Sequence, residues 1–238
     1  MDMKQLLIFL MFFAASIGVL AQEDDTRTVD EAQIEKETRA IKSFSKLKVS
    51  KGINVTLIKG DEALAEINIV NAPLSDVIIE NDQNELTIKM RTRIYQDVSV
   101  QVYLTYQDIR EITLGSGSSI DNQEVLQGKV LVLNAGLDSV IDLKLDVTSV
   151  EADVSAARIT LEGYAKNLEA KATTGGKLQG QNFEVDKAYV TANTGGIVTV
   201  KATKLLDAKA GTGGTIEYLG EPEKMNTKET FGGKVVKI

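Results

Sequence analysis

Cysteine, histidine and tryptophan are absent from this chain of 238 residues, and aromatic residues make up only 5% of it. Without cysteine there are no disulfides, thiol nucleophiles or thiolate metal sites. Without histidine the chain lacks the commonest general base near neutral pH and the commonest zinc ligand. Catalytic sites of the Ser-His-Asp and Cys-His types are therefore excluded. Any chemistry would depend on carboxylates, Lys, Arg, Tyr or a cation held by oxygen atoms.

Positive charge is also scarce. The chain has 27 Lys and Arg against 34 Asp and Glu, which gives a net charge of −7. Binding to nucleic acid or to anionic lipid without sequence preference needs a basic footprint, so the composition argues against both. Hydrophobic residues make up 43% of the chain, enough for a sizeable core. With so few aromatics, that core must consist mainly of Val, Ile, Leu and Ala.

The first 21 residues are predicted to be a secretory signal peptide. Lys4 supplies the positive end, residues 6–20 are apolar, and small residues precede a cleavage site before Gln22. The apolar run is short for a bilayer span. We therefore expect export to the periplasm, the cell surface or the medium, with no membrane span after cleavage. An uncleaved membrane anchor is the alternative.

The next segment, residues 22–42, is polar and acidic with few apolar positions. Such a composition predicts a flexible leader, with a short helix near residues 30–41 as an option. From residue 43 to residue 238 the sequence changes character, and we predict a single β domain over that range.

Alternation of apolar and polar residues is the dominant pattern after Phe44. Val98, Val100, Val102 and Leu104 show it most clearly, with polar residues between them. This period of two is typical of β-strands. No later stretch has a helical period long enough to compete, so an all-β fold is expected.

Three near-copies occupy the last third of the chain. LEAKATTGGKL at 168–178, AYVTANTGGIV at 188–198 and LDAKAGTGGTI at 206–216 align column by column. Of the 19 glycines, 16 lie from residue 115 onward, which places the sharp corners there. The apolar residue after each corner recurs every 18 to 20 residues, at Ile120, Val140, Ile159, Leu178, Val198 and Ile216.

A period of about 20 residues with one corner per copy predicts stacked coils of parallel strands. One copy cannot bury its own apolar face, so equivalent residues should lie above one another about 4.8 Å apart. Ala170, Val190 and Ala208 would form one internal column, and Ala172 and its equivalents another. We predict a right-handed parallel β-helix-like solenoid with the sheet of residues 44–104 capping one end. The segments 221–222 and 231–233 are expected to cover the other, and a two-sheet β-sandwich is the alternative.

Several segments resemble one family, described as "Putative auto-transporter adhesin, head GIN domain". They are F-x-x-L-x-V-x-x-G-I-N-V-x-L at 44–57, NELTI at 84–88, GSGS at 115–118 and L-x-A-x-A-G-T-G-G-x-I-x-Y-x-G-x-P at 206–222. The resemblance implies an exported β-solenoid of the envelope of Bacteroidota-like bacteria and no established activity. The fourth corner position, often Asp in the family, is Ser118, Gly176, Gly196 and Gly214 here. A role for acidic corners is therefore not carried over.

Two groups of charged residues invite a catalytic or metal-binding interpretation. Asp138, Asp142 and Asp146 could form a calcium site, but Asp142 and Asp146 alternate with apolar residues and flank Lys144, as on a solvated face. Lys171, Lys201 and Lys209 could serve a polysaccharide lyase, but edge charges that prevent strand pairing are the simpler interpretation. We therefore predict no catalytic, cofactor or metal residues.

The sequence favours an exported, non-catalytic module that binds or adheres through its outer wall. Tyr189, Thr191 and Asn193 would lie along such a wall, and a glycan or a surface protein is the expected kind of partner. A carbohydrate-active enzyme such as a polysaccharide lyase is the alternative. The sequence gives no indication of the ligand or of the oligomeric state.

Overall fold

The computed structural model describes residues 34–238. Nearly all of their regular secondary structure is β-strand. The predicted signal peptide and most of the predicted leader lie outside these residues. Within the described part of the chain, no helix is long and apolar enough to cross a membrane. One short 3-10 helix, η1 (Leu74–Asp76), interrupts the strands.

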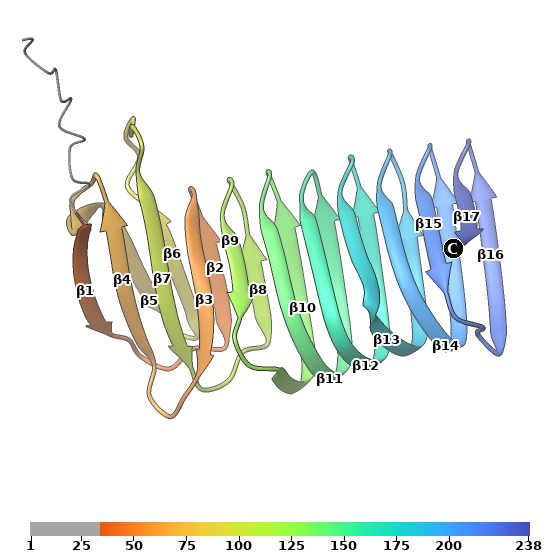
Figure 1. The fold of residues 1–238 in the computed structure, drawn as a ribbon, viewed down its shortest axis with the longest axis horizontal. Coiled ribbons are helices and arrows are strands. Elements are labelled where there is room, and N and C mark those ends of the chain that lie inside the picture. The colour runs from red at the N-terminus through yellow and green to blue at the C-terminus, as the bar shows by residue number, and fades with distance from the viewer. Residues whose placement is uncertain (1–33) are drawn as a thin grey trace, which may run out of the picture. The chain divides into compact units, whose positions relative to one another are not determined.

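The strands lie side by side along the long axis of the domain, and only the later ones follow one another in chain order (Figure 1). They are β1 (Ile34–Ala40), β2 (Lys46–Ser50), β3 (Ile53–Lys59), β4 (Leu64–Val70), β5 (Val77–Asp82), β6 (Glu85–Met90), β7 (Ser99–Tyr106), β8 (Glu111–Leu114), β9 (Ser119–Asn122), β10 (Leu126–Gly136), β11 (Val140–Ser155), β12 (Arg158–Thr173), β13 (Lys177–Ala192), β14 (Ile197–Gly211), β15 (Thr215–Leu219), β16 (Lys224–Thr230) and β17 (Lys234–Lys237).

The predicted parallel β-solenoid is confirmed, with about seven turns. Each of the strands β11 to β14 covers 15 or 16 residues and forms one complete rung. Its first half pairs in parallel on one face and its second half on the other (Figure 1). Because neighbouring rungs run in the same direction, the alternative of a β-sandwich is ruled out.

The internal columns contain the residues that the repeat predicts. Ala172 pairs in register with Ala192 and Ala192 with Ala210, while Ala170, Val190 and Ala208 form the next column. All five alanines are 4% exposed or less, as their place inside the coil requires. One column differs by a residue: Ile141, and not Val140, pairs with Ile120 and Ile159. The corner before Ile141 has the same length as the corner before Ile120, with Leu137 and Asp138 in the positions of Ser116 and Gly117, so the prediction was displaced by one residue.

Tight turns connect the two faces of the solenoid along one edge (Figure 1). In the turn between β13 and β14, Thr194 and Gly195 have φ values of 50° and 71°. Two successive positive φ angles are typical of a type I′ turn, whose second position strongly favours glycine. The Gly195 amide donates a hydrogen bond of 3.3 Å to the carbonyl oxygen of Thr212 in the next corner, so the corners themselves form a ladder.

A curled sheet closes the N-terminal end, as predicted. β4 pairs antiparallel with β7 and with β1, and β5 pairs antiparallel with β6. β3 pairs in parallel with β7 of this sheet and with β9 of the solenoid, and β2 pairs in parallel with β8. The antiparallel strands end the regular stacking and cover the apolar interior at this end.

Two suggestions about the ends of the domain were wrong. A short helix near residues 30–41 was one option within the predicted flexible leader, but residues 34–40 form the strand β1. Its side chains are mostly exposed on both faces, so the sequence there shows no alternation. Residues 221–222 and 231–233 were expected to cover the C-terminal end. Instead, pairing resumes after Pro222, and Phe231-Gly232 is one more corner between β16 and β17.

Candidate functional site

The outer surface of one solenoid face is built from equivalent positions of four rungs. We call it the Tyr189 face. It consists of the outward side chains of residues 149–155, 167–173, 187–193 and 205–211. Tyr189 lies between Glu169 and Asp207, its partners in register on either side. Its ring is 45% exposed, and it therefore offers an aromatic surface between two carboxylates.

A second row of the Tyr189 face contains two lysines and, on the first rung, Asp153. Thr191 lies in register between Lys171 and Lys209, and Lys209 Nζ is 3.4 Å from a carboxylate oxygen of Asp207. Asn193 follows at the corner, on the same side of the strand. The three predicted residues Tyr189, Thr191 and Asn193 are thus brought together on one wall. The charged side chains of the two rows make this wall polar along its whole length.

The predicted lysine group is divided between the two faces. Lys171 and Lys209 belong to the Tyr189 face, whereas Lys201 lies on the first half of β14 and forms an ion pair of 2.8 Å with Glu184. A polysaccharide lyase needs its Lys or Arg base next to the substrate and to the metal ion that binds the substrate. This arrangement does not bring the three lysines to one point.

The acidic residues of β11 also remain separate. Asp138 occupies a corner with φ of 60°, while Asp142 and Asp146 point outward and alternate with buried residues, as predicted. Asp142 lies between Asp121 and Thr160. Within residues 34–238 no group of three metal-binding side chains is close enough to hold an ion. The absence of a metal site therefore stays a prediction that the geometry does not oppose.

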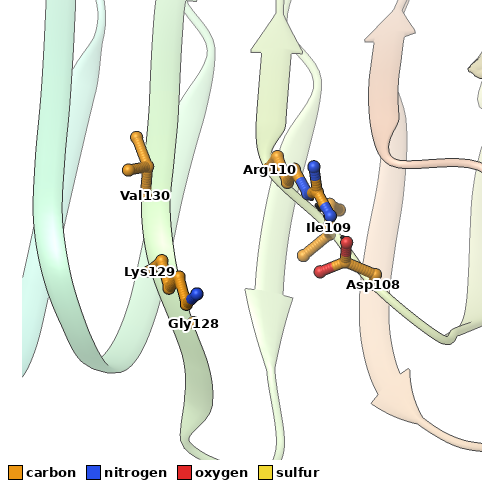
Figure 2. Close-up of a pocket in the computed structure, with 6 residues that line it drawn as sticks. All are labelled: Asp108, Ile109, Arg110, Gly128, Lys129 and Val130. Carbon is orange, nitrogen blue, oxygen red and sulfur yellow. Dashed lines mark hydrogen bonds and ion pairs between the residues drawn. The ribbon is translucent and has the colours of Figure 1, made fainter.

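A pocket of about 570 Å³ opens between the chain that enters β8 and the first half of β10 (Figure 2). Its lining residues are Asp108, Ile109, Arg110, Gly128, Lys129 and Val130. Ile109 is buried and forms an apolar base, while Val130 is about half exposed. The Arg110 Nε atom is 2.8 Å from a carboxylate oxygen of Asp108, and both side chains are exposed.

A change in pairing produces this pocket. β8 pairs with β10 only from Val132 to Ala135, so β10 extends beyond its neighbour by half its length. Over Gln127 to Val130 its edge toward β8 has no strand partner, although its other edge pairs with β11. Backbone donors and acceptors on an open edge can bind an extended chain.

The lining of the pocket determines what it could hold. Arg110 and Lys129 contribute two cations against the single carboxylate of Asp108. Ile109, Val130 and the open edge of β10 supply apolar contact and hydrogen-bonding groups. Such a site suits a small polar or acidic group on a glycan or an extended peptide. Sequence reasoning missed this pocket, because Gly128 is a weak signal and the lack of a strand partner depends on register.

One ion pair lies at the bend between the two faces. Lys204 Nζ donates to a carboxylate oxygen of Asp186 at 2.8 Å, and this hydrogen bond lowers the pKa of Asp186 and raises that of Lys204. Burial, and then the negative charge of Asp186, raise the pKa of the Tyr164 phenol nearby. The three groups are paired with one another, and this arrangement is typical of a structural contact.

Comparisons with known proteins agree with this architecture. A family model described as "Putative auto-transporter adhesin, head GIN domain" matches residues 43–222. A "putative adhesin" of Bacteroides fragilis NCTC 9343 has a similar solved structure, with a TM-score of 0.77 and 15% identity over 87% of this chain and 97% of that chain.

Two structures from Parabacteroides distasonis ATCC 8503 are similar as well. A "putative adhesin" has a TM-score of 0.67 and 18% identity over 87% of this chain and 98% of that chain. A "putative lipid binding protein" has a TM-score of 0.63 and 13% identity over 86% of this chain and 96% of that chain. At such identities the likeness shows the fold alone. No curated protein matches the sequence.

Proposed function

The chain belongs to the family described as "Putative auto-transporter adhesin, head GIN domain", and on this basis we propose that it is an exported, non-catalytic binding or adhesion module of the cell envelope. The family description supports a role in binding surface partners. The similar structures carry the name adhesin as well. Export through the predicted signal peptide would place the module in the periplasm, at the cell surface or outside the cell.

The in-register Tyr189 face is the observation that carries this proposal. Each rung repeats the outward positions of the rung before it, and the buried alanine columns beneath hold them in place. A partner with a repeating structure, such as a glycan chain or an extended peptide, could contact several rungs at once. Individually weak contacts add up when the sites are held at fixed spacing.

The Tyr189 side chain is the expected anchor of the face. Its exposed ring can stack on the apolar side of a sugar or on a peptide side chain, and the neighbouring Glu169 and Asp207 can accept hydrogen bonds from hydroxyl or amide groups. The pocket beside Ile109 would hold a second, separate group. Neither place combines the cation, base and acid that a lyase needs.

A binding screen with matched variants tests the proposal. The chain from Gln22 to Ile238 is applied to a glycan array and to envelope proteins, together with Tyr189→Ala and Tyr164→Ala. Tyr164 is exposed to a similar extent but lies outside the Tyr189 face, beside the Asp186–Lys204 pair at the bend. Loss of a saturable interaction in Tyr189→Ala, with binding retained in Tyr164→Ala, would support the Tyr189 face. Cation-dependent release of unsaturated sugars from a uronate polymer would overturn the non-catalytic assignment.

A further inference from the structure

The connection between β6 and β7 differs from every other corner of the described chain. It runs through residues 91–98 and rises above the row of tight turns (Figure 1). Its central residue, Ile94, is 97% exposed. Arg93 and Tyr95 flank this isoleucine directly, and Arg91 lies three residues before it.

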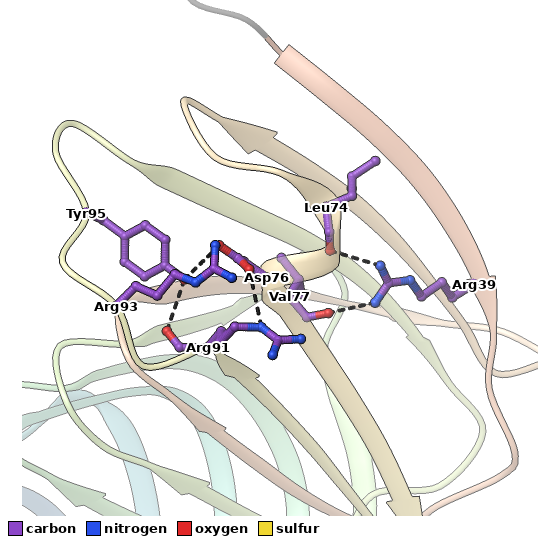
Figure 3. Close-up of polar contacts among 7 residues, drawn as sticks. All are labelled: Arg39, Leu74, Asp76, Val77, Arg91, Arg93 and Tyr95. Atoms are coloured by element: carbon purple, nitrogen blue, oxygen red, sulfur yellow. Dashed lines mark hydrogen bonds and ion pairs between the residues drawn. The ribbon is translucent and has the colours of Figure 1, made fainter.

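A buried carboxylate holds the base of this loop. Asp76, at the end of η1, is only 1% exposed. Its two oxygens lie 3.3 Å from Arg91 Nε and 3.2 Å from Arg93 Nη1 (Figure 3). The Tyr95 hydroxyl is 3.1 Å from Asp76 Oδ2 and 3.0 Å from the carbonyl oxygen of Arg91. Side chains before and after Ile94 therefore hold the loop to Asp76.

The strand β1 supports the same anchor from the other side. Arg39 donates hydrogen bonds to the carbonyl oxygens of Val77, at 2.8 Å, and Leu74, at 3.1 Å (Figure 3). These bonds fix η1, which carries Asp76. Asp76, Arg91, Arg93 and Tyr95, which we call the Asp76 cluster, are thus held to the curled sheet through η1 and β1. The cluster in turn holds the loop above it in place.

Positive charge exceeds negative charge at the loop. Arg91 and Arg93 share one buried carboxylate, and Lys51 joins them through a hydrogen bond of 2.5 Å to Thr92. Each guanidinium has five N–H donors, and each arginine side chain is more than half exposed, so donors beyond those that face Asp76 can reach another partner. Asp97, at the far end of the loop, is the one exposed carboxylate among residues 91–98.

A protruding isoleucine beside two arginines has the chemistry of a membrane-surface anchor. Apolar side chains enter the acyl boundary, and Arg binds phosphate. A soluble polyanion would use the arginines but would gain nothing from Ile94. The rest of the chain is acidic overall, and repulsion from an anionic surface would confine contact to this loop.

We propose that residues 91–97 dock the protein onto a lipid surface that carries anionic phosphate headgroups. Ile94 enters the acyl boundary, and the guanidiniums of Arg91 and Arg93, held in place by Asp76, bind headgroup phosphates. This contact is separate from the Tyr189 face, which would remain free for a second partner. The inference does not depend on what the Tyr189 face binds.

Vesicle sedimentation tests the proposal with the chain from Gln22 to Ile238, which omits the apolar signal segment. The vesicles contain phosphatidylcholine alone or with phosphatidylglycerol. We expect binding to the anionic vesicles only, about tenfold weaker for Ile94→Ser and about fivefold weaker for Arg93→Gln. Phe231→Ser is the matched control, because Phe231 is 88% exposed at a corner near the other end of the solenoid, and its binding should not change.

Three outcomes would overturn the proposal. The first is no binding of the unaltered chain to anionic vesicles. The second is equal binding of the Ile94→Ser variant and the unaltered chain. The third is full competition by a soluble sulfated polysaccharide with no dependence on Ile94, which would identify the loop as a polyanion site. Circular dichroism and the unfolding midpoint of each variant ensure that a loss of binding does not reflect a loss of fold.

Discussion

Gly196 lies directly against the backbone carbonyl group of Ala172 in the preceding rung. A Cβ atom added at Gly196 would be only 2.3 Å from that carbonyl oxygen. The equivalent glycines Gly176 and Gly214 have the same relationship to Val154 and Ala192. The two glycines of each pair thus have different tasks: the first adopts the positive φ of the turn, and the second lets successive rungs approach.

Substitution of this second glycine should destabilise the fold. Gly196→Ala forces two rungs apart, and we expect a loss of about 1–3 kcal/mol in the free energy of unfolding, the usual range for overpacking. Gly115→Ala is the control, because no atom lies within 4 Å of a Cβ at that position, and its effect should be within about 0.5 kcal/mol. Denaturant unfolding followed by circular dichroism measures both. Equal effects would contradict the close-approach explanation.

The internal alanine columns should be equally intolerant of larger side chains. Ala192 is fully buried between Ala172 and Ala210, so Ala192→Leu should lower the stability by about 1–3 kcal/mol or prevent folding. Thr191→Leu places the same side chain one residue earlier, on the outer wall, and should change the stability by less than about 0.5 kcal/mol. Thermal unfolding of the two variants compares the effect on stability of a leucine inside the coil with that of a leucine on its outer wall. A mild effect at Ala192 would mean that the coil has internal space.

The C-terminal rungs were the part of the fold that sequence reasoning described best. Their corners contain a Thr-Gly-Gly or Asn-Thr-Gly-Gly run, and the columns beneath them contain alanine at matching positions. Earlier corners use other residues for the same turn: Leu137 and Asp138 have positive φ, and Ala156 forms a shorter turn. Without the glycine signal, the repeat there could be placed only to within a residue, which explains the error at Val140.

The candidate sites were less predictable than the fold. Tyr189, Thr191 and Asn193 share a wall because a period of two puts them on one side of a strand. The pocket at Ile109 depends instead on where β8 stops pairing with β10, and the Asp76 cluster joins residues from η1 and the β6–β7 loop. Such long-range relationships leave no local pattern. β1 escaped prediction for a related reason, since an exposed edge strand has no buried side to enforce alternation.

Removal of the buried Asp76 carboxylate should destabilise the protein more than removal of an exposed, ion-paired carboxylate. Asp76→Asn keeps the size of the side chain but leaves Arg91 and Arg93 without a counter-charge. We expect a loss of about 1–3 kcal/mol, the range for a hydrogen-bonded charged group. Asp108→Asn, which breaks the exposed pair with Arg110, should lower the stability by at most about 1 kcal/mol. Unfolding midpoints distinguish the two, and a larger loss at Asp108 would argue against the anchoring role.

The Asp186–Lys204 pair should give the stability a defined pH dependence. The hydrogen bond from Lys204 holds the pKa of Asp186 below its ordinary value, so the folded state binds a proton there less readily than the unfolded state. The stabilisation is therefore present above about pH 4 and is lost as the pH falls through the folded pKa. Lys204→Met should be less stable than the unaltered chain at neutral pH, and the difference should shrink in acid. Lys171→Met is the control on an unrelated wall, and a difference that persists at pH 2 would exclude this mechanism.

Four lysines on the terminal strands should prevent end-to-end association of the solenoid. Within the described chain β16 pairs only with β14 and β17 only with β15, so both strands present open edges. Lys224 and Lys228 lie on the first, and Lys234 and Lys237 on the second. Lysine on an edge strand opposes pairing with another chain, because a second strand would have to desolvate it or meet like charge.

Neutralising two of these lysines tests that role. The double variant Lys228→Thr and Lys234→Thr should self-associate more than the unaltered chain as the concentration rises, because threonine favours strand pairing and the repulsion is reduced. The control removes the same charge from the Tyr189 face with Lys171→Thr and Lys209→Thr, on strands already paired on both edges. Size-exclusion chromatography with light scattering gives the mass of each. If the control associates as strongly as the edge variant, net charge and not edge protection keeps the molecules apart.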